Sequence, residues 1–270
     1  QNSGRAVVDA GLKYVHNDIC YPCQLVIGQF LDALAGGGYD PHKVALMITQ
    51  TGGGCRASNY IHLLRKALEK AGYGYVPVIS LSMAGLEKNS GFRITLPVLR
   101  MAIAALAYGD LLMSLDNQTK PYEKQSGDSA RAVARWQKKL SVMLADGKGC
   151  FVRDVRRISK QIAAEFDAIP VNPKAKLKVG IVGEIYVKYS ALGNNDLEQF
   201  LFEQGCEVCL PGILGFAMYM AENNVVGYKL YGGNPVIKTA AAAAGRDLYS
   251  FGCAIADATK EWKNGNSDGG

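Results

Sequence analysis

Apolar residues in the first part of the chain follow two different periods. Segments 44–49 and 75–82 are short apolar runs of the kind that form buried strands. Between them, Ile61, Leu64 and Leu68 recur at the spacing of one helix face. A strand, a helix and a second strand in this order predict a βαβ unit, which normally means a parallel sheet.

Helical patterns flank this unit on both sides. Segment 7–15 is predicted to be a short helix, and Pro22 suits the first position of a second helix. The apolar stripe behind Pro22 consists of Val26, Ile27, Phe30, Leu31 and Leu34. Residues 95–168 are predicted to be mostly helical, because stripes of the same period run through 133–143 and 155–166.

A second alternation of strand and helix follows the proline-containing linker 167–176. Segment 177–187 has the pattern of a buried strand, 197–205 that of a helix, and 206–212 that of another strand. The alanine-rich stretch 240–262 is predicted to be a final helix.

We therefore expect an α/β fold in which two Rossmann-like parallel-sheet halves are joined by a helical layer. The first half spans 1–94, the helical layer 95–170, and the second half with the C-terminal helix 171–270. The Gly-, Asn- and Ser-rich end suggests a fragment of a longer chain.

Composition narrows the functional classes. The chain has 270 residues, of which 49% are hydrophobic and 20% charged, and a dispersed net charge of +6. It lacks the interleaved aromatic residues of a single-stranded nucleic-acid platform, so we expect no nucleic-acid partner. Arg100 and Asp110 interrupt the longest apolar stretch, so we expect no membrane span.

The cysteines point to metal or redox chemistry in a reducing, cytoplasmic compartment. The chain has seven cysteines and no recognisable export signal, which favours a reducing compartment. An odd number of cysteines also argues against a pure disulfide framework. Cys20 and Cys23 form a C-x-x-C directly before a predicted helix, where backbone amides and the helix dipole stabilise a thiolate. A thiol oxidoreductase is one interpretation, and two ordinary buried cysteines are the other.

The loop 52–57, "GGGCRA", matches G-x-G-x-x-[GA] between a strand and a helix, which is the placement of a dinucleotide-binding fingerprint. Gly52, Gly53, Gly54 and Arg56 are its candidate cofactor-binding residues. The next strand ends without the acid that would hold a ribose. A glycine turn that merely lets strand and helix pack closely is therefore the alternative.

A metal centre is the third interpretation. Cys20 and Cys55 each precede a predicted helix, and in a parallel sheet both loops can lie at the same carboxyl edge. Backbone N–H groups and helix N-termini there would lower the charge cost of an iron–sulfur cluster. The tight pairs of a zinc ribbon and the dense run of a ferredoxin are both missing. Cys206 and Cys209 fall within a predicted strand, whose alternation places them on opposite faces, and we interpret them as core residues.

A set of motifs occurs in a fixed order over residues 10–235. They are "YVHNDICYP", "ALMITQTGGGCRASNYIHLLRKALEKAG", "PVISLSMAGLEKNSGF", "YGDLLM", "PYEK", "KVGIVGEIYVKYSALGNNDLEQFLFEQG" and "YKLYGG". Together they resemble the C-terminal, activase-associated region of 2-hydroxyacyl-CoA dehydratase activase-related proteins, which is itself similar to the dehydratase subunits. The specificity lies in the ordered set, since no single motif is unique.

The resemblance implies Rossmann-like halves that hold a [4Fe–4S] or double-cubane cluster at their junction. It marks Cys20 in "NDICYP" and Cys55 in "GGGCR" as cluster cysteines. Cys23, at a position that usually carries a small residue other than cysteine in such proteins, is a further candidate. A later cysteine motif of the family, resembling C-x-Q-P-F-G-C, is missing from this sequence.

The resemblance also implies a function and partners. Actin-like ATPase portions of such proteins bind ATP and drive low-potential electrons onto the cluster, so we expect ATP on an activase partner or on a missing portion. We expect electron transfer or activation in an anaerobic, homo-oligomeric system that serves an acyl-CoA substrate or a dehydratase partner. Glu184 is the catalytic candidate for the cleft, and Lys188 and Arg56 could meet the acidic CoA or the charge of the cluster.

Overall fold

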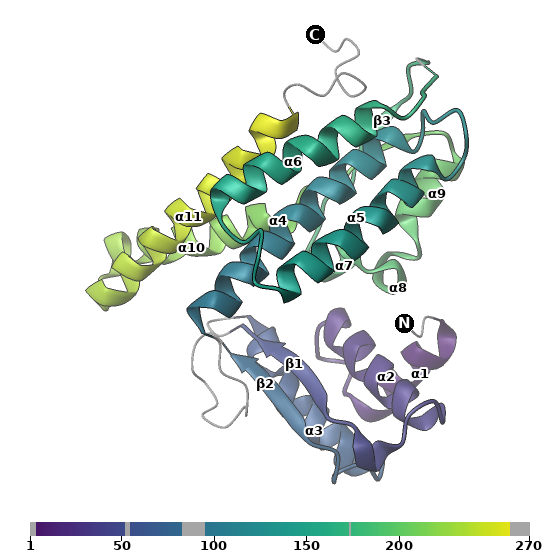
Figure 1. The fold of residues 1–270 in the computed structure, drawn as a ribbon. Helices are drawn as coiled ribbons and strands as arrows, with labels where there is room; N and C mark the ends of the chain where they lie inside the picture. The colour runs from purple at the N-terminus through teal and green to yellow at the C-terminus, as the bar shows by residue number, and fades with distance from the viewer. Residues whose placement is uncertain (1–3, 52–54, 83–94, 173, 260–270) are drawn as a thin grey trace. The chain divides into compact units, whose positions relative to one another are not determined.

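The computed structural model describes residues 4–51, 55–82, 95–172 and 174–259. The chain divides into two compact units (Figure 1). The first unit comprises residues 1–93 and 183–197, and the second comprises 94–182 and 198–270. Helices dominate the described residues, which also contain two small parallel sheets, so the expected mixture of helices and parallel strands is confirmed.

The first unit contains the predicted βαβ arrangement. Strand β1 (Leu46–Gln50) is followed by the 3₁₀ turn η2 (Arg56–Asn59), helix α3 (Tyr60–Lys70) and strand β2 (Val78–Ser82). The strands are parallel, with Leu46 opposite Val78 and Ile48 opposite Ser80. The predicted stripe on α3 is confirmed, because Ile61, Leu64 and Leu68 are all buried.

Two further helices of the first unit come before β1 in the chain, and they cross each other closely. They are α1 (Arg5–Tyr14) and α2 (Tyr21–Ala35), and the short 3₁₀ turn η1 (Pro41–Lys43) leads from them into β1. A Cβ atom on Gly28 would overlap the carbonyl oxygen of Val7, and one on Gly11 would overlap that of Gln24. Glycine at both positions thus lets the two backbones touch.

The segment 183–197 returns to the first unit as two short helices, α7 (Ile185–Tyr189) and α8 (Ala191–Asn194). The Tyr186 hydroxyl lies 3.4 Å from Oε1 of Gln29 on α2. The predicted strand over 177–187 is therefore wrong beyond its first residues. Only β3 (Lys178–Gly180) forms, because Gly183 adopts a φ of 148° and Glu184 then caps a helix.

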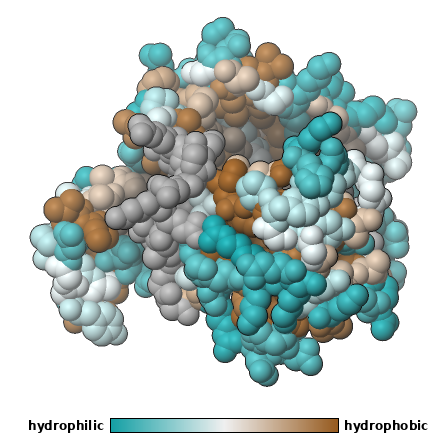
Figure 2. All heavy atoms as spheres, turned by 90° about the horizontal axis from the view of Figure 1, so that it is seen from below, coloured by the Kyte–Doolittle hydropathy of each residue, from teal (hydrophilic) through white to brown (hydrophobic). Residues whose placement is uncertain are grey.

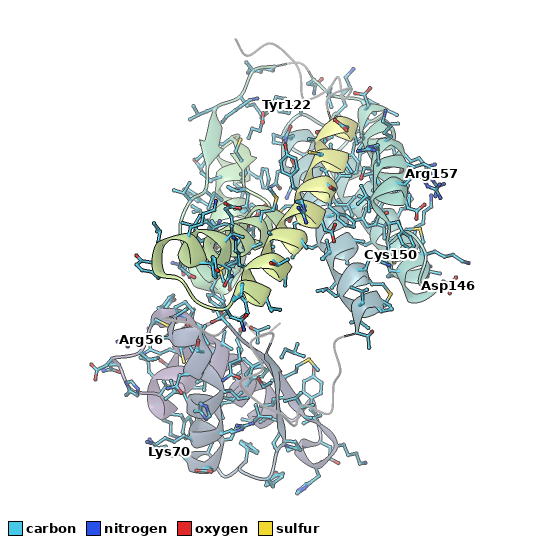
Figure 3. All side chains as sticks on the ribbon, turned by 90° about the vertical axis from the view of Figure 1, so that its left-hand side faces the viewer. Arg56, Lys70, Tyr122, Asp146, Cys150 and Arg157 are labelled. Carbon is cyan, nitrogen blue, oxygen red and sulfur yellow. The ribbon has the colours of Figure 1, made fainter. Side chains whose placement is uncertain are left out.

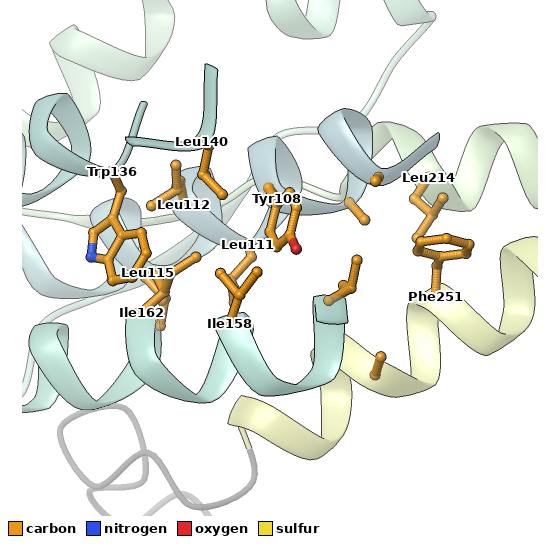
Figure 4. Close-up of a cluster of buried hydrophobic side chains, with 14 of the residues drawn as sticks. Tyr108, Leu111, Leu112, Leu115, Trp136, Leu140, Ile158, Ile162, Leu214 and Phe251 are labelled. Carbon is orange, nitrogen blue, oxygen red and sulfur yellow. The ribbon is translucent and has the colours of Figure 1, made fainter. Parts of the chain in front are cut away.

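The second unit is built around α4 (Leu96–Thr119). Helices α5 (Asp128–Ala145), α6 (Val152–Asp167), α10 (Ile213–Tyr231) and α11 (Pro235–Thr259) all contact it. Their buried side chains form one cluster, in which Tyr108, Leu111 and Leu115 of α4 meet Trp136 of α5 and Ile162 of α6 (Figure 4). The predicted helical region 95–168 is thus confirmed.

Helix α4 is also the one described helix that is long and apolar enough to cross a membrane by length and composition. Its buried apolar residues, from Ala104 to Leu115, belong to the core cluster of the second unit. On the face drawn in Figure 2, apolar side chains occur in separate patches among hydrophilic ones.

Strand β3 pairs in parallel with β4 (Glu207–Cys209), and α9 (Leu197–Glu203) precedes β4. The Tyr122 hydroxyl donates to the buried Glu207 carboxylate at 2.7 Å, and Lys178 Nζ lies 3.5 Å from its other oxygen. Asp110 of α4 accepts the backbone N–H groups of Ile213 and Leu214 and so caps α10. Burial raises the pKa of Asp110, although these two bonds act in the opposite direction.

Candidate functional site

Cys20 occupies the N-cap position of α2. Its backbone is extended, with φ −64° and ψ 146°, and its carbonyl oxygen accepts the N–H of Cys23 at 3.0 Å. Pro22 is the second residue of α2, one position after its predicted place, and in this first turn its missing N–H leaves no bond unmade. The Cys20 side chain is partly exposed, and the first turn of α2 carries no acid.

Cys55 occupies the N-cap position of η2 and is exposed. The buried side chain of Gln50, at the end of β1, fixes the turn that carries it. Gln50 Nε2 donates to the Ser58 carbonyl at 2.8 Å, and its Oε1 accepts the Ser80 hydroxyl at 2.8 Å. Gln50 thereby joins β1 and β2 to the η2 turn.

The structure brings the two cysteine-bearing loops together. The guanidinium of Arg56, at the start of η2, donates to the Asp18 carbonyl two residues before Cys20. Arg56 lies close to the first residue of α3, whereas Lys70 is the last residue of that helix (Figure 3). The hydroxyl of Tyr60, the first residue of α3, lies 2.7 Å from Cys20 Sγ. One short stretch, 55–60, therefore contacts the Cys20 loop at two points.

Three cysteines contribute to the raised pKa of Tyr60. Its pKa lies well above the ordinary range, chiefly because the ring is partly buried. The hydrogen bond to Cys20 and the nearby Cys20, Cys23 and Cys55 add to this effect. Cys20 is thus hydrogen-bonded to the Tyr60 phenol, while Cys23 and Cys55 act on it only through their charge.

The loops that carry Cys20 and Cys55 come together in a different way from the one the sequence suggested. No described strand leads into Cys20, which follows α1 and a short turn. The loop is brought to the sheet because α2 packs on α3, with Ile27 and Leu31 in the same core as Ile61 and Leu64. The packing of α2 on α3 therefore brings the two loops together, whereas the sequence suggested that two strands ending at the same sheet edge would do so.

Cys23 differs from the other two cysteines. It is fully buried. Its pKa is raised to about 12, mainly by this burial and to a lesser extent by the charge of the neighbouring Cys20. A thiol with such a pKa stays protonated at neutral pH, whereas the thiolate is the form that attacks disulfides and binds metals. The interpretation of Cys23 as a buried core cysteine fits this environment better than a redox dithiol does.

The other predicted site residues have local contacts. The Glu184 carboxylate accepts the N–H groups of Tyr186 and Val187 at 2.9 and 2.7 Å and caps α7. Lys188 Nζ lies 5.2 Å from the centre of the Tyr189 ring. Neither contact tests the role in catalysis or CoA binding that the sequence suggested. Gly52, Gly53 and Gly54 lie outside the described residues.

The remaining cysteines lie in the second unit. Cys150 and Cys206 are buried, and Cys253 on α11 is partly exposed. Cys209 is exposed, so its interpretation as a core residue is wrong, while that of Cys206 is confirmed. Cys209 is exposed because β4 has only three residues and ends at Cys209, whose side chain is not covered by the core.

The ligand set at the site is incomplete in the described part of the chain. All seven cysteines are free thiols, and no three His, Cys, Asp or Glu side chains among the described residues are gathered as a metal site. Cys20 and Cys55 match the ligands of an iron–sulfur cluster in residue type alone. Further ligands would have to come from outside this set.

Tyr60 is the site residue that sequence reasoning missed. The sequence does hold one signal for it, since a tyrosine five residues after Cys55 opens the helix that follows the glycine loop. Nothing in that spacing points to Cys20, which lies 40 positions away.

Comparison of the chain with models of known protein families, with curated proteins and with solved structures gives no match. The resemblance to activase-related proteins thus rests on the ordered motifs quoted above and stays a prediction.

Proposed function

We propose that this chain is an iron–sulfur electron-transfer or activation component of a 2-hydroxyacyl-CoA dehydratase-like system. It would pass low-potential electrons from an ATP-dependent activase to CoA-thioester dehydration or a related reduction. The observation that supports the proposal is the approach of the two loops that carry Cys20 and Cys55, which Arg56 and Tyr60 both connect.

Each residue at the site has a distinct part in this proposal. Cys20 and Cys55 would hold the cluster through their sulfurs, and a bound cluster supplies the capacity to take up and release one electron. Arg56 ties the two loops and brings a positive charge beside them, which offsets part of the negative charge of a thiolate-bound cluster. The buried Cys23 packs beneath the site and is not assigned a ligand role.

The surroundings of the site follow from the same proposal. The two small parallel sheets would be the centres of two Rossmann-like halves. The activase would be an actin-like ATPase domain or subunit that carries the ATP, and the electron acceptor would be an acyl-CoA or a dehydratase partner. We place this system in the cytoplasm of an anaerobe, as a homo-oligomer. These statements rest on the motif resemblance, and the geometry of the first unit is compatible with them.

The decisive experiment is anaerobic reconstitution of the chain with iron and sulfide. We expect bound iron, acid-labile sulfide and a broad absorbance band at about 400 nm. Replacing either predicted ligand, by Cys20→Ser or Cys55→Ser, should weaken iron retention against a chelator by about tenfold or more, since a thiolate ligand is lost.

Cys253→Ser is the matched control, because it removes a partly exposed thiol from the second unit and should leave the iron content unchanged. Equal iron in all four proteins would contradict the proposal, as would a wild-type chain that takes up no iron at all.

A further inference from the structure

A cavity of about 260 Å³ lies in the second unit, where α4 contacts β4. One wall consists of Ser114, Asn117 and Gln118, which share one face of α4 because they are three or four positions apart. The other wall is the segment 208–211, which ends β4 and leads toward α10. In open α/β sheets, ligands bind beyond the carboxyl ends of parallel strands, and this cavity lies at that end of β4.

Two hydrogen-bonded anchors hold the walls of this cavity in place. At the start of β4, the buried Glu207 carboxylate accepts the hydroxyl of Tyr122, which follows the end of α4. Beyond the segment 208–211, the first N–H groups of α10 are held by Asp110, one helical turn before Ser114. The segment is thus fixed against α4 on both sides, so a ligand loses little affinity in ordering the walls.

Asn117 is the polar residue of this lining that is almost completely buried. Only 3% of the residue is exposed, and its Nδ2 has no hydrogen-bond partner among the described residues. The neighbouring Gln118 differs, since its Nε2 donates to Ser114 Oγ at 2.9 Å. An unpartnered buried amide is unfavourable, because it has lost its hydrogen bonds to water and gained none in return. Since Asn117 lines the cavity, a ligand there can supply the missing partner.

The chemistry of the lining favours an uncharged ligand. The described lining consists of two side-chain amides, a hydroxyl, a thiol and the apolar Val208, Leu210 and Pro211, without a charged side chain. A carboxylate or an ammonium group would lose its hydration there and gain no opposite charge. A carboxamide instead has a donor and an acceptor side by side, like Asn117 itself, so the two groups can pair through two parallel hydrogen bonds.

We propose that the cavity between α4 and the end of β4 binds a small uncharged molecule with a carboxamide group on an apolar body, and that Asn117 recognises the carboxamide. The apolar body then contacts Leu210 and Pro211, as is usual in small-molecule sites. This site lies outside the residues of the proposed iron–sulfur site and does not depend on them. The exposed thiol of Cys209 belongs to the lining, so its reactivity reports whether the cavity is occupied.

The test uses the full chain and benzamide, an apolar ring with one carboxamide, as the probe. N-Ethylmaleimide alkylates accessible thiols, and peptide mass spectrometry follows each cysteine separately. A ligand of this size binds with a Kd on the order of 1 mM, so about 10 mM benzamide should slow the alkylation of Cys209 by about tenfold. Cys253 on α11 does not line the cavity, and its rate should not change. Benzoate, which has the same ring and a negative charge, should not protect Cys209.

Asn117→Leu removes the amide and keeps a side chain of similar size. Because Nδ2 of Asn117 has no partner to lose, we expect this variant to be at least as stable as the wild type in urea denaturation. It should bind benzamide about tenfold more weakly or worse, since both hydrogen bonds to the ligand are gone. Thr119→Val is the matched control, because it removes another buried, unpartnered polar group from α4 outside the lining and should leave the protection unchanged.

The outcomes are distinct. Protection of Cys209 by benzamide in the wild type and in Thr119→Val, but not in Asn117→Leu, would support the site. No protection in the wild type, equal protection by benzoate, or protection that persists in Asn117→Leu would overturn it. If Asn117→Leu does not fold, the comparison of benzamide with benzoate on the wild type decides. None of these measurements involves iron, so they are independent of the outcome for the proposed function.

Discussion

The two units of this molecule pack their helices by opposite means. In the first unit, α1 and α2 cross where Gly11 and Gly28 bring backbone against backbone. In the second unit, α4 is held at a distance by large buried side chains such as Leu111 and Tyr108. Contact through backbone leaves no room to add an atom, whereas contact through side chains leaves a cavity when atoms are removed.

The difference matters for the site because the glycine contact lies on the helix that begins with Cys20. The sulfur of Cys20 meets Tyr60 only if α2 keeps its place on α3. Chemistry in the first unit thus depends on a tight backbone crossing, while the second unit has a core without any assigned chemistry. Substitutions that add or remove single groups can separate these two modes of packing.

The largest effect is expected from Leu111→Ala in α4. Leu111 is completely buried in the cluster of the second unit, so truncation loses hydrophobic burial and leaves a cavity. We expect the free energy of unfolding to fall by about 2–5 kcal/mol in urea denaturation. Val142→Ala on α5, where the side chain is 60% exposed, is the control and should change it by less than about 0.5 kcal/mol.

Iron binding sharpens this first prediction. Below the unfolding transition, Leu111→Ala should leave iron bound at Cys20 and Cys55 unchanged, because the substitution lies in the other unit. A loss of iron in the folded variant would show that the two units are energetically coupled, and the contrast drawn here would not hold.

The next largest effect is expected from Gly28→Ala in α2. The added methyl group would overlap the Val7 carbonyl oxygen and lie 3.0 Å from the N of Gly11, and both of these are backbone atoms that no rotamer change can move. The helices must separate, so we expect a loss of about 1–3 kcal/mol in the free energy of unfolding. Because the shift moves α2, iron retention at Cys20 should also decrease. Unchanged stability would mean that α1 and α2 do not cross at these glycines.

Sequence patterns predicted the elements whose burial is one-sided. The stripe Ile61, Leu64 and Leu68 gave α3, and the short apolar runs on either side gave β1 and β2. The same reasoning failed over 177–187, where the local capping of α7 by Glu184 outweighs an apolar pattern. Helix α10 was not predicted either. Only Leu214 and Val225 are buried along its 19 residues, so no clear stripe marks it.

The site was predictable only in part. Cys20 and Cys55 were each recognisable as cysteines before a helix, because capping preferences and glycine turns are local. Their common neighbour Tyr60 depends on how α2 packs on α3, and the contact spans 40 positions of the chain. Tertiary packing of this kind has no period in the sequence, and so pattern reasoning does not find it.

The smallest effect is expected from Gly109→Ala in α4, and it has the opposite sign. Gly109 also lies inside a helix, but a Cβ atom there would meet nothing within 4 Å. It lines a cavity of about 330 Å³ together with residues such as Leu112 and Val133. Alanine is the better helix former and restricts the unfolded chain, so we expect a gain of about 0.5–1 kcal/mol in the free energy of unfolding. Measured beside Gly28→Ala, it applies the same chemical change to both units. If both variants lost stability equally, the glycine content of the helices, and not the backbone contact of α1 with α2, would explain the effect.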